Sequence, residues 1–259
     1  MSKAQTQFIR TLFFGFALSF SLACAACSGQ AAQTNSQSDL PVAAGSGQGS
    51  IKLDIPEKID TRARYLFYLH GRIVEDKGLR AVHERHGVYE FEKILETFKA
   101  ADFIVVSEAR AKDTDIKGYA AKVVAGVNGL LKAGVPPRHI TVVGASKGAG
   151  IAMHTSSLLK HREVNFVLMA GCGEQTLKNS ELNLYGNVLS IYDASDEGAG
   201  TCGRLFARSE GLSRRKETKI NLGLGHGFLY RPHKEWIEPA VEWARQSWEQ
   251  ISAGNQDIF

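Results

Sequence analysis

Six short runs rich in apolar residues, separated by segments with helical periodicity, constrain the fold of this chain more than any other feature. The runs lie at Arg64–Leu69, Phe103–Ser107, Ile140–Val143, Val164–Met169, Val188–Tyr192 and Ile220–Leu224. Amphipathic helices are predicted at residues 90–100, 120–131, 148–160 and 236–251. Buried strands that alternate with helices form a mainly parallel sheet with helices on both faces. The sequence therefore predicts a doubly wound α/β domain.

The first fifty residues differ in composition from the rest and predict an exported protein. Residues 1–27 combine positive charges at Lys3 and Arg10 with a short apolar stretch and small residues up to Cys27, as in a signal peptide. Residues 28–50 are rich in Gln, Ser, Gly and Ala, which predicts a flexible tether. The folded domain is expected at residues 51–259.

Two processing routes fit this N-terminus. The Ala23-Cys24-Ala25 stretch fits a signal-peptidase site, which would release a soluble periplasmic or secreted protein. The stretch that ends at Cys27 resembles a bacterial lipoprotein box, and an alternative box ends at Cys24. Lipidation of Cys27 would anchor a periplasmic protein in the membrane, and this is the route we favour.

The two remaining cysteines, Cys172 and Cys202, form an even pair in the folded part of the chain. Each follows a neighbouring predicted strand, and in an oxidising compartment such a pair favours a disulfide. Two buried free thiols are the alternative.

Charge and histidine spacing argue against two kinds of ligand. The formal net charge of +4 is small and evenly spread, so nucleic-acid binding is not expected. His83 and His86 are spaced to share a helix face, but Gly87 and the charged neighbours favour a solvated loop over a metal site. We expect no metal ion and no cofactor, and a small molecule as substrate.

Polar residues gather where the predicted strands end. In parallel sheets, ligands bind beyond the carboxyl ends of the strands. The residues at those positions are His70-Gly71-Arg72, Glu108–Arg110, Ser146-Lys147, Gly171–Gly173, Asp193–Asp196 and Gly225–Gly227. This set is rich in groups that perform acid–base and nucleophilic chemistry.

Ser146 is the central residue of the most informative of these segments. Residues 144–148 read Gly-Ala-Ser-Lys-Gly, directly after the third apolar run and before a helical segment. This is the Gly-x-Ser-x-Gly pattern of a nucleophile elbow, a sharp strand-to-helix turn that exposes a serine hydroxyl. The glycines are needed because side chains at those positions would collide with the neighbouring strand and helix.

A nucleophilic serine needs a base, and the base needs an orienting acid. His226 lies between two glycines after the last predicted strand and is favoured as the base, whereas His233 is expected to begin the last helix. Asp193, Asp196 and Glu197 follow the fifth predicted strand. Asp196 is favoured because it lies a turn beyond the strand end, while Asp193 could brace the loop. All three acids could instead simply form turns.

From Arg64 to the C-terminal helix, these motifs resemble the α/β-hydrolase superfamily, in particular its small exported bacterial members. The matching residues are His70-Gly71, Gly144–Gly148, Asp196 and Gly225-His226-Gly227. The resemblance implies that Ser146 is the nucleophile, His226 the general base and Asp196 the orienting acid. It also implies an oxyanion hole formed by the backbone N–H groups of Arg72 and Lys147, with residues 70–72 beside the substrate.

The expected function is therefore hydrolysis of an ester or related acyl bond through an acyl-serine intermediate. Only residues 174–186 separate the fourth and fifth predicted strands, which leaves no room for a substantial lid and favours a small soluble substrate. The cationic side chains of Arg72 and Lys147 suggest an anionic group near the scissile bond. Alternatively, they face solvent or pair with Glu108 or Asp193.

Two other functions stay open. Residues 144–150 also match the Gly-x-x-x-Gly-x-Gly turn of short-chain dehydrogenases, which bind NAD(P). The position of this turn after the third strand argues against that function, as does Pro232 between Tyr230 and Lys234. The other alternative is a non-catalytic lipoprotein with a hydrolase scaffold, because a fold does not guarantee activity.

Overall fold

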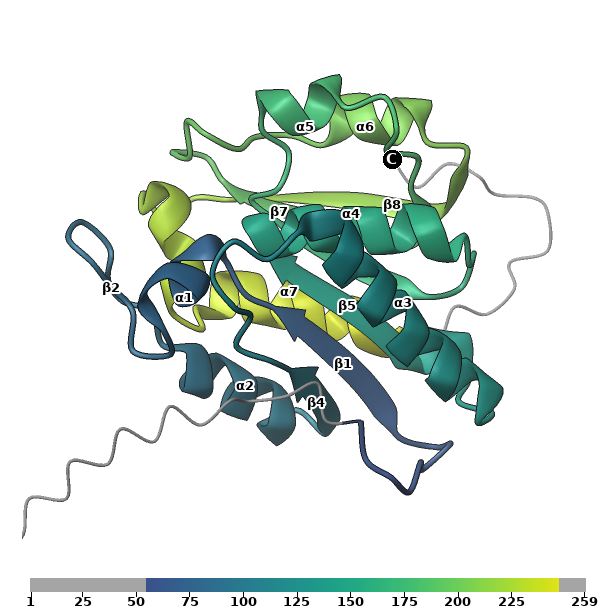
Figure 1. The fold of residues 1–259 in the computed structure, drawn as a ribbon. Coiled ribbons are helices and arrows are strands. Elements are labelled where there is room, and N and C mark those ends of the chain that lie inside the picture. Colours follow the sequence, from purple (N-terminus) through teal and green to yellow (C-terminus); the bar gives the residue numbers. More distant parts are fainter. Residues whose placement is uncertain (1–54, 247–259) are drawn as a thin grey trace, which may run out of the picture. The chain divides into compact units, whose positions relative to one another are not determined.

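A six-stranded sheet, parallel throughout, forms the centre of the part of the chain that the computed structural model describes, residues 55–246 (Figure 1). Its strand order is β4-β1-β5-β6-β7-β8. The strands are β1 Arg64–Leu69, β4 Phe103–Ser107, β5 Ile140–Ala145, β6 Asn165–Met169, β7 Tyr185–Asp193 and β8 Gly211–Ile220. A separate antiparallel hairpin pairs β2 Val82–His83 with β3 Gly87–Val88.

The helices up to α6 lie between successive strands of the chain, and α7 follows the last strand, β8. They are α1 Arg72–Lys77, α2 Phe91–Ala100, α3 Ile116–Lys132, α4 Lys147–Leu159, α5 Glu174–Lys178, α6 Gly203–Arg208 and α7 Lys234–Arg245, with 3-10 turns η1 Pro137–His139 and η2 Gly225–Tyr230. Crossover helices of this kind let consecutive strands run parallel. The connection between β6 and β7 holds only the five-residue α5, so no lid is inserted there.

Both faces of the sheet are covered, because successive side chains of a strand point to opposite sides. In β1, Tyr65 and Phe67 pack into one core with α3 and α4, while Leu66 and Tyr68 pack into a second core with α2 and α7. All four of these side chains are fully buried. The prediction of a doubly wound, mainly parallel α/β fold is confirmed.

The predicted strand at Ile220–Leu224 is wrong. Ile220 is instead the last residue of β8, an edge strand that begins at Gly211. Arg215, Lys216 and Lys219 of β8 are exposed, since an edge strand need not be apolar on both faces. The apolar-run criterion therefore selected the turn after the strand instead of the strand itself.

Several predictions concern residues outside the described range. The signal peptide, the tether and lipidation of Cys27 all fall before residue 55, and the predicted end of the last helix at residue 251 falls after residue 246. Among the described residues, no helix combines the length and apolarity that a membrane span requires.

A disulfide joins Cys172 and Cys202, which lie 30 residues apart with a Cα–Cα distance of 5.2 Å. Cys172 follows β6, and Cys202 is the N-cap of α6, so the bond ties the β7–β8 connection to the sheet. Both residues are buried within the core that contains α3 and α4.

We expect the Cys172→Ala/Cys202→Ala variant to lose about 3–4 kcal/mol of unfolding free energy, because a closed loop of this length restricts the unfolded chain. Urea denaturation measures the loss. The parent protein in a strong reductant should show the same loss, whereas the variant should not respond to the reductant. An unchanged midpoint of the fully reduced parent would contradict the expectation.

Candidate active site

Ser146 lies at the sharp turn between β5 and α4, with φ 54° and ψ −115°. This left-handed backbone is strained for a residue with a side chain, and such strain is concentrated at functional sites. The flanking glycines explain how the turn is tolerated. A Cβ on Gly144 would lie 2.3 Å from the carbonyl oxygen of Gly148, and one on Gly148 would lie 1.9 Å from the carbonyl oxygen of Leu69.

The structure brings Ser146, His226 and Asp196 into one hydrogen-bonded chain. His226 Nε2 lies 2.8 Å from Ser146 Oγ, and His226 Nδ1 lies 2.7 Å from Asp196 Oδ2. The carboxylate accepts a hydrogen bond from Nδ1–H, which leaves the Nε2 lone pair facing the serine hydroxyl. Asp196 is 4% exposed and His226 38% exposed, so the acid is enclosed while the imidazole stays open to a substrate.

The order of these residues along the sheet characterises the fold. The serine follows β5, the acid follows β7, and the histidine follows β8, all at the carboxyl ends of parallel strands. That arrangement, with a nucleophile elbow after the central strand, is characteristic of one fold. This is an α/β-hydrolase fold.

Sequence comparison adds little to this. No protein-family model matches the chain, and no curated protein matches it in sequence. Solved structures match over most of the chain. They include a protein from a study of LipS and LipT, two metagenome-derived lipolytic enzymes (12% identity, 71% of this chain, 95% of that chain, TM-score 0.48). A sugar hydrolase (YeeB) from Lactococcus lactis matches at 13% identity over 75% of this chain and 96% of its own, with a TM-score of 0.46.

A third match is a protein of unknown function from Agrobacterium tumefaciens, named as a candidate α/β hydrolase. It is 19% identical over 68% of this chain and 82% of its own, with a TM-score of 0.47. Identities this low describe a fold and not a reaction.

Asp193 takes part in a different set of contacts from Asp196. Its Oδ1 accepts hydrogen bonds from the Ser195 backbone N–H and hydroxyl, and its Oδ2 accepts one from the Leu222 N–H. Ser195 Oγ in turn accepts from the Gly225 N–H at 2.9 Å. Burial by itself would raise the pKa of the Asp193 carboxyl, but these hydrogen bonds outweigh it and hold the pKa below its usual value. Asp193 therefore braces the two loops that carry Asp196 and His226.

Glu197, the third acid considered, is exposed. His233 forms the N-cap of α7, as expected for a residue that begins the last helix. The sequence left the choice among the three acids open, and the hydrogen bonds of the described chain favour Asp196 as the partner of His226.

Arg72 and Lys147 each occupy the first position of a helix, α1 and α4 respectively. Backbone N–H groups in a first helical turn have no partner inside the helix. The N-caps, Gly71 and Ser146, make no side-chain capping bond, so these N–H groups are not capped. A Cβ on Gly71 would lie 3.6 Å from Ser146 Cβ, which shows how closely α1 begins beside the serine.

His70 does not face the site as the predicted substrate-binding role required. Its ring is fully buried, with Nδ1 2.8 Å from the Gly71 carbonyl oxygen and Nε2 accepting from the Arg110 N–H at 3.0 Å. Burial, followed by the nearby charge of Arg110, lowers the pKa of His70 to about 3. The ring is therefore neutral, with its proton on Nδ1, and holds the Gly71 carbonyl.

This buried neutral histidine makes stability depend on pH. Between pH 6.5 and about 3, His70 binds a proton in the unfolded chain but not in the folded one, so its contribution to stability falls as pH falls. By pH 5, the loss from this one group is about 2 kcal/mol. The His70→Gln variant should lose this part of the pH dependence. Chemical denaturation of both proteins at pH 5 and pH 7.5 measures it, and equal slopes would contradict the assignment.

The sequence analysis missed Glu75, which lies in α1 and is buried beneath the site. Its Oε2 lies 2.5 Å from Lys147 Nζ, and its Oε1 lies 2.8 Å from Arg110 Nε. The segment Arg-Ile-Val-Glu-Asp-Lys reads as a charged surface helix. The one available signal was the pair of basic residues, Arg110 and Lys147, which follow successive predicted strands of the chain. Because Lys147 pairs with Glu75, it is not the free cation that the expected anionic substrate required. Arg72, the other cationic side chain considered, is exposed.

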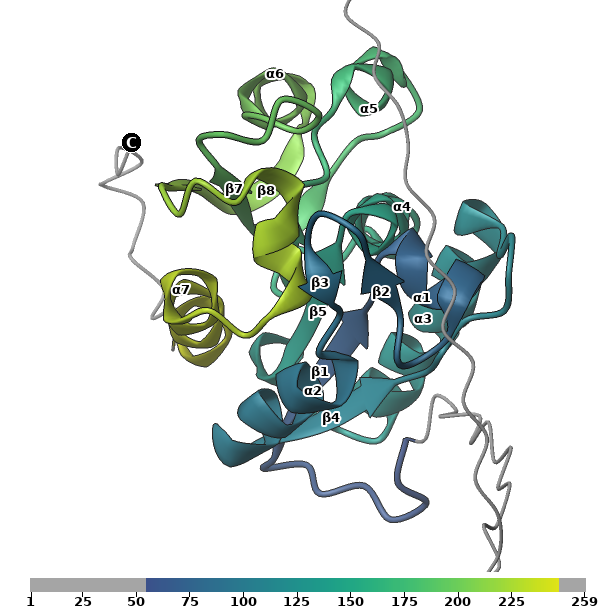
Figure 2. The same cartoon turned by 90° about the vertical axis from the view of Figure 1, so that its left-hand side faces the viewer.

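The β2–β3 hairpin covers the flank of His226. His83 and His86 stack with ring centroids 4.6 Å apart, and His86 packs against Tyr230 of η2 at 5.1 Å. The hairpin accordingly lies beside η2 in the ribbon (Figure 2). A Cβ on Gly227 would lie 2.5 Å from His86 Nδ1.

Within residues 55–246, no three His, Cys, Asp or Glu side chains gather as a metal site requires.

The geometry also bears on the dinucleotide alternative. Tyr230 ends η2 and is buried, whereas Lys234 begins α7, so the two side chains do not share one helix. The Tyr-x-x-x-Lys pattern of short-chain dehydrogenases needs both on one helical face. The turn at Gly144–Gly150 instead carries Ser146 toward His226.

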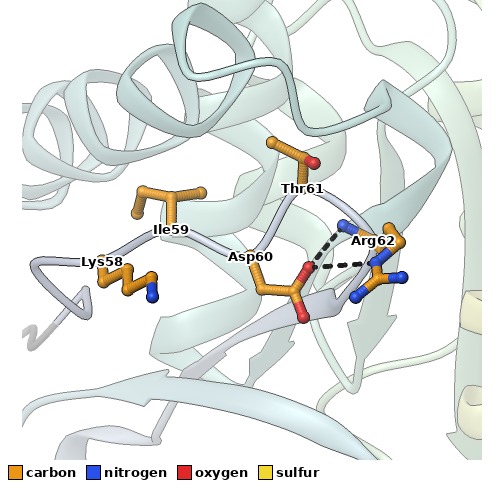
Figure 3. A pocket seen from close by; sticks show the side chains of 5 residues that line it. All are labelled: Lys58, Ile59, Asp60, Thr61 and Arg62. Carbon is orange, nitrogen blue, oxygen red and sulfur yellow. Dashed lines mark hydrogen bonds and ion pairs between the residues drawn. The ribbon is translucent and has the colours of Figure 1, made fainter.

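A hollow of about 450 Å³ lies away from these residues, against residues 58–62 before β1 (Figure 3). Its polar side chains are exposed, and Asp60 accepts from the Arg62 N–H within the loop itself. The hollow adjoins the amino end of β1, whereas the triad lies at the carboxyl ends of the strands. The residues that line this hollow do not form a pair of nucleophile and base.

Proposed function

We propose that this protein is a serine hydrolase that cleaves an ester or related acyl bond of a small soluble substrate. One observation carries the proposal: the hydrogen-bonded chain from Ser146 Oγ to His226 Nε2 (2.8 Å) and from His226 Nδ1 to Asp196 Oδ2 (2.7 Å). A nucleophile within reach of a base, which is itself held by an acid, is the arrangement that acyl transfer needs.

In the first half of the reaction, Ser146 Oγ forms a bond to the acyl carbon as its proton moves to His226 Nε2. The tetrahedral intermediate collapses, the bond to the leaving oxygen breaks, and His226 returns the proton to that oxygen. In the second half, water attacks the acyl-serine, gives its proton to His226, and releases the acid and free Ser146. Asp196 keeps the imidazole oriented and stabilises its protonated form. No cofactor is required.

The oxyanion of each tetrahedral intermediate would accept hydrogen bonds from the backbone N–H groups of Arg72 and Lys147. Their first-turn positions in α1 and α4 support this role, because such N–H groups lack intrahelical partners and lie at the positive ends of the peptide dipoles. Gly71 allows the close approach of α1 to Ser146.

The openness of the site supports a proposal for the substrate class. The short connection between β6 and β7 supports an open site for small soluble esters. Because Lys147 pairs with the buried Glu75, an anionic group in the substrate is no longer part of the proposal. We propose neutral short-chain esters as the substrates instead.

We further propose that the enzyme is exported and anchored in the membrane through a lipidated Cys27, with residues 28–50 as a tether. The sequence pattern of residues 1–27 supports export, and a disulfide between Cys172 and Cys202 fits an oxidising compartment. Mass spectrometry of the mature protein tests this proposal: a diacylglyceryl group on Cys27 supports it, and an unmodified N-terminus contradicts it.

The proposed activity is tested by labelling residues 51–259 with a fluorophosphonate and recording the intact mass. One adduct on the parent, absent from the Ser146→Ala and His226→Ala variants, is expected together with hydrolysis of p-nitrophenyl acetate by the parent alone. A folded parent that forms no adduct would contradict the proposal and favour a non-catalytic scaffold.

A further inference from the structure

A buried ionic cluster of Glu75, Lys147 and Arg110 joins α1 and α4, the two helices whose first residues are the proposed oxyanion donors. The side chains of Glu75 and Arg110 are 0% exposed, and that of Lys147 is 9% exposed. We propose that Glu75 is a positioning residue: it fixes the spacing between the N–H groups of Arg72 and Lys147. This inference rests on the proposed function, since it concerns the oxyanion hole of that same site.

Glu75 links the two helices that carry the donors. It lies in the first turn of α1, three residues after Arg72 and on the same side of the helix. Its Oε2 lies 2.5 Å from the ammonium of Lys147, the first residue of α4. The carboxylate thus spans from the start of one helix to the start of the other, the two points whose separation defines the oxyanion hole.

A second set of contacts runs from the same carboxylate to the peptide of Arg72. Arg110 donates from Nε to Glu75 Oε1 at 2.8 Å, donates from Nη2 to the His70 carbonyl, and donates from its backbone N–H to His70 Nε2. His70 then donates from Nδ1 to the Gly71 carbonyl. In a planar trans peptide, C=O and N–H point in opposite directions, so fixing the Gly71 carbonyl also fixes the N–H of Arg72.

Stability alone does not account for such a cluster. Two charges taken out of water lose solvation that their mutual attraction barely restores, and apolar replacements of buried ion pairs are often neutral or stabilising. The net charge of the cluster is a competing explanation for any effect of Glu75 on catalysis. One carboxylate, two cations and a neutral His70 leave a net charge of about +1 near the forming oxyanion, which would stabilise it without any positioning.

The positioning explanation and the net-charge explanation predict different activities for two variants of Glu75. Glu75→Asp keeps the charge but shortens the side chain by one methylene, and Glu75→Gln keeps the length but removes the charge. If Glu75 positions the donors, both variants lose activity. If only charge matters, Glu75→Asp equals the parent and Glu75→Gln is faster, because the positive charge is then larger.

The experiment measures kcat and KM for p-nitrophenyl acetate, per site that reacts with a fluorophosphonate. A second readout uses an aryl trifluoromethyl ketone labelled with ¹³C at the carbonyl. Ser146 Oγ adds to that carbon, its proton moves to His226, and the NMR shift records the pH at which the hemiketal oxygen ionises. This readout reports the oxyanion hole and is insensitive to a general loss of stability.

For both variants we expect kcat to fall about tenfold to a hundredfold, since a misplacement near 1 Å has effects of that size. KM should stay within about twofold of the parent, and the hemiketal oxygen should ionise at higher pH, because both donors act on the oxyanion and not on the bound ester. Lys147→Arg combined with Glu75→Asp restores the reach of the pair and should recover part of the activity.

The matched control is the exposed pair of Lys117 and Glu181, 2.6 Å apart and 61% and 63% exposed. Glu181→Asp and Glu181→Gln should leave kcat and the hemiketal ionisation unchanged. If Glu75→Gln fails to fold, Glu75→Asp decides alone. A parent-like kcat and hemiketal ionisation in Glu75→Asp would overturn this inference while the proposed function stands, whereas a folded parent without an adduct overturns both.

Discussion

The Asp196→Asn variant is expected to lose about 10⁴-fold in kcat for ester hydrolysis while remaining folded. An asparagine amide can offer an N–H to His226 Nδ1, which then becomes the acceptor. The ring proton moves to Nε2, and Nε2 can no longer accept the proton of Ser146. Steady-state kinetics and fluorophosphonate labelling should both record the loss, with circular dichroism as the check on folding.

The Asp193→Asn variant is the matched comparison, because it changes the same residue type three positions away. Its amide cannot accept all the hydrogen bonds from Ser195 and Leu222 that the carboxylate accepts. We expect a loss of about 1–3 kcal/mol in unfolding free energy and a much smaller loss in kcat than for Asp196→Asn. If Asp193→Asn had the larger effect on kcat at full folding, Asp193 would be the catalytic acid and the assignment of Asp196 would be wrong.

Gly148→Ala is expected to remove about 4 kcal/mol or more of unfolding free energy, or to prevent folding. Although Gly148 lies in helix α4, an added Cβ would be 1.9 Å from the Leu69 carbonyl oxygen and 2.8 Å from that of His70. Those are backbone atoms of the segment that leads into the oxyanion hole, and they cannot move aside without displacing β1. Urea denaturation and the yield of soluble protein measure the effect.

The control for this prediction is Gly129→Ala in the last turn of α3, where an added Cβ meets nothing within 4 Å. Alanine in an exposed helix stabilises by about 0.5–1 kcal/mol relative to glycine. The same substitution in two helices should therefore change stability in opposite directions. A stabilised Gly148→Ala variant would show that α4 does not lie as close to β1 as the structure places it.

The fold was predictable because strands buried on both faces produce apolar runs, and β1 and β4 lie at the predicted residues. The turn at Ser146 was predictable for a similar reason, since its glycines are required by contacts within a short stretch of chain. The conformation of residues whose contacts are local can therefore be predicted from the sequence. Their roles in catalysis are a separate matter that the proposed experiments address.

The parts that could not be predicted depend on contacts between distant residues. Asp193 and Asp196 differ in the residues to which each one is hydrogen-bonded. The partners of Asp193 are Ser195 and Leu222, and Leu222 is 29 residues away. Glu75 reaches Arg110 and Lys147 across 35 and 72 positions. No pattern within α1 distinguishes a buried glutamate from a solvated one.

The charged strand β8 also determines how copies of this protein meet. An edge strand offers unpaired backbone groups to which a strand of another molecule can add, which is a route to aggregation. On β8, the exposed Arg215, Lys216 and Lys219 would bring like charges together in any such pairing of two copies. That repulsion acts over about 8 Å at physiological ionic strength, so concentrated salt weakens it. The feature that concealed this strand in the sequence therefore opposes growth of the sheet at its β8 edge.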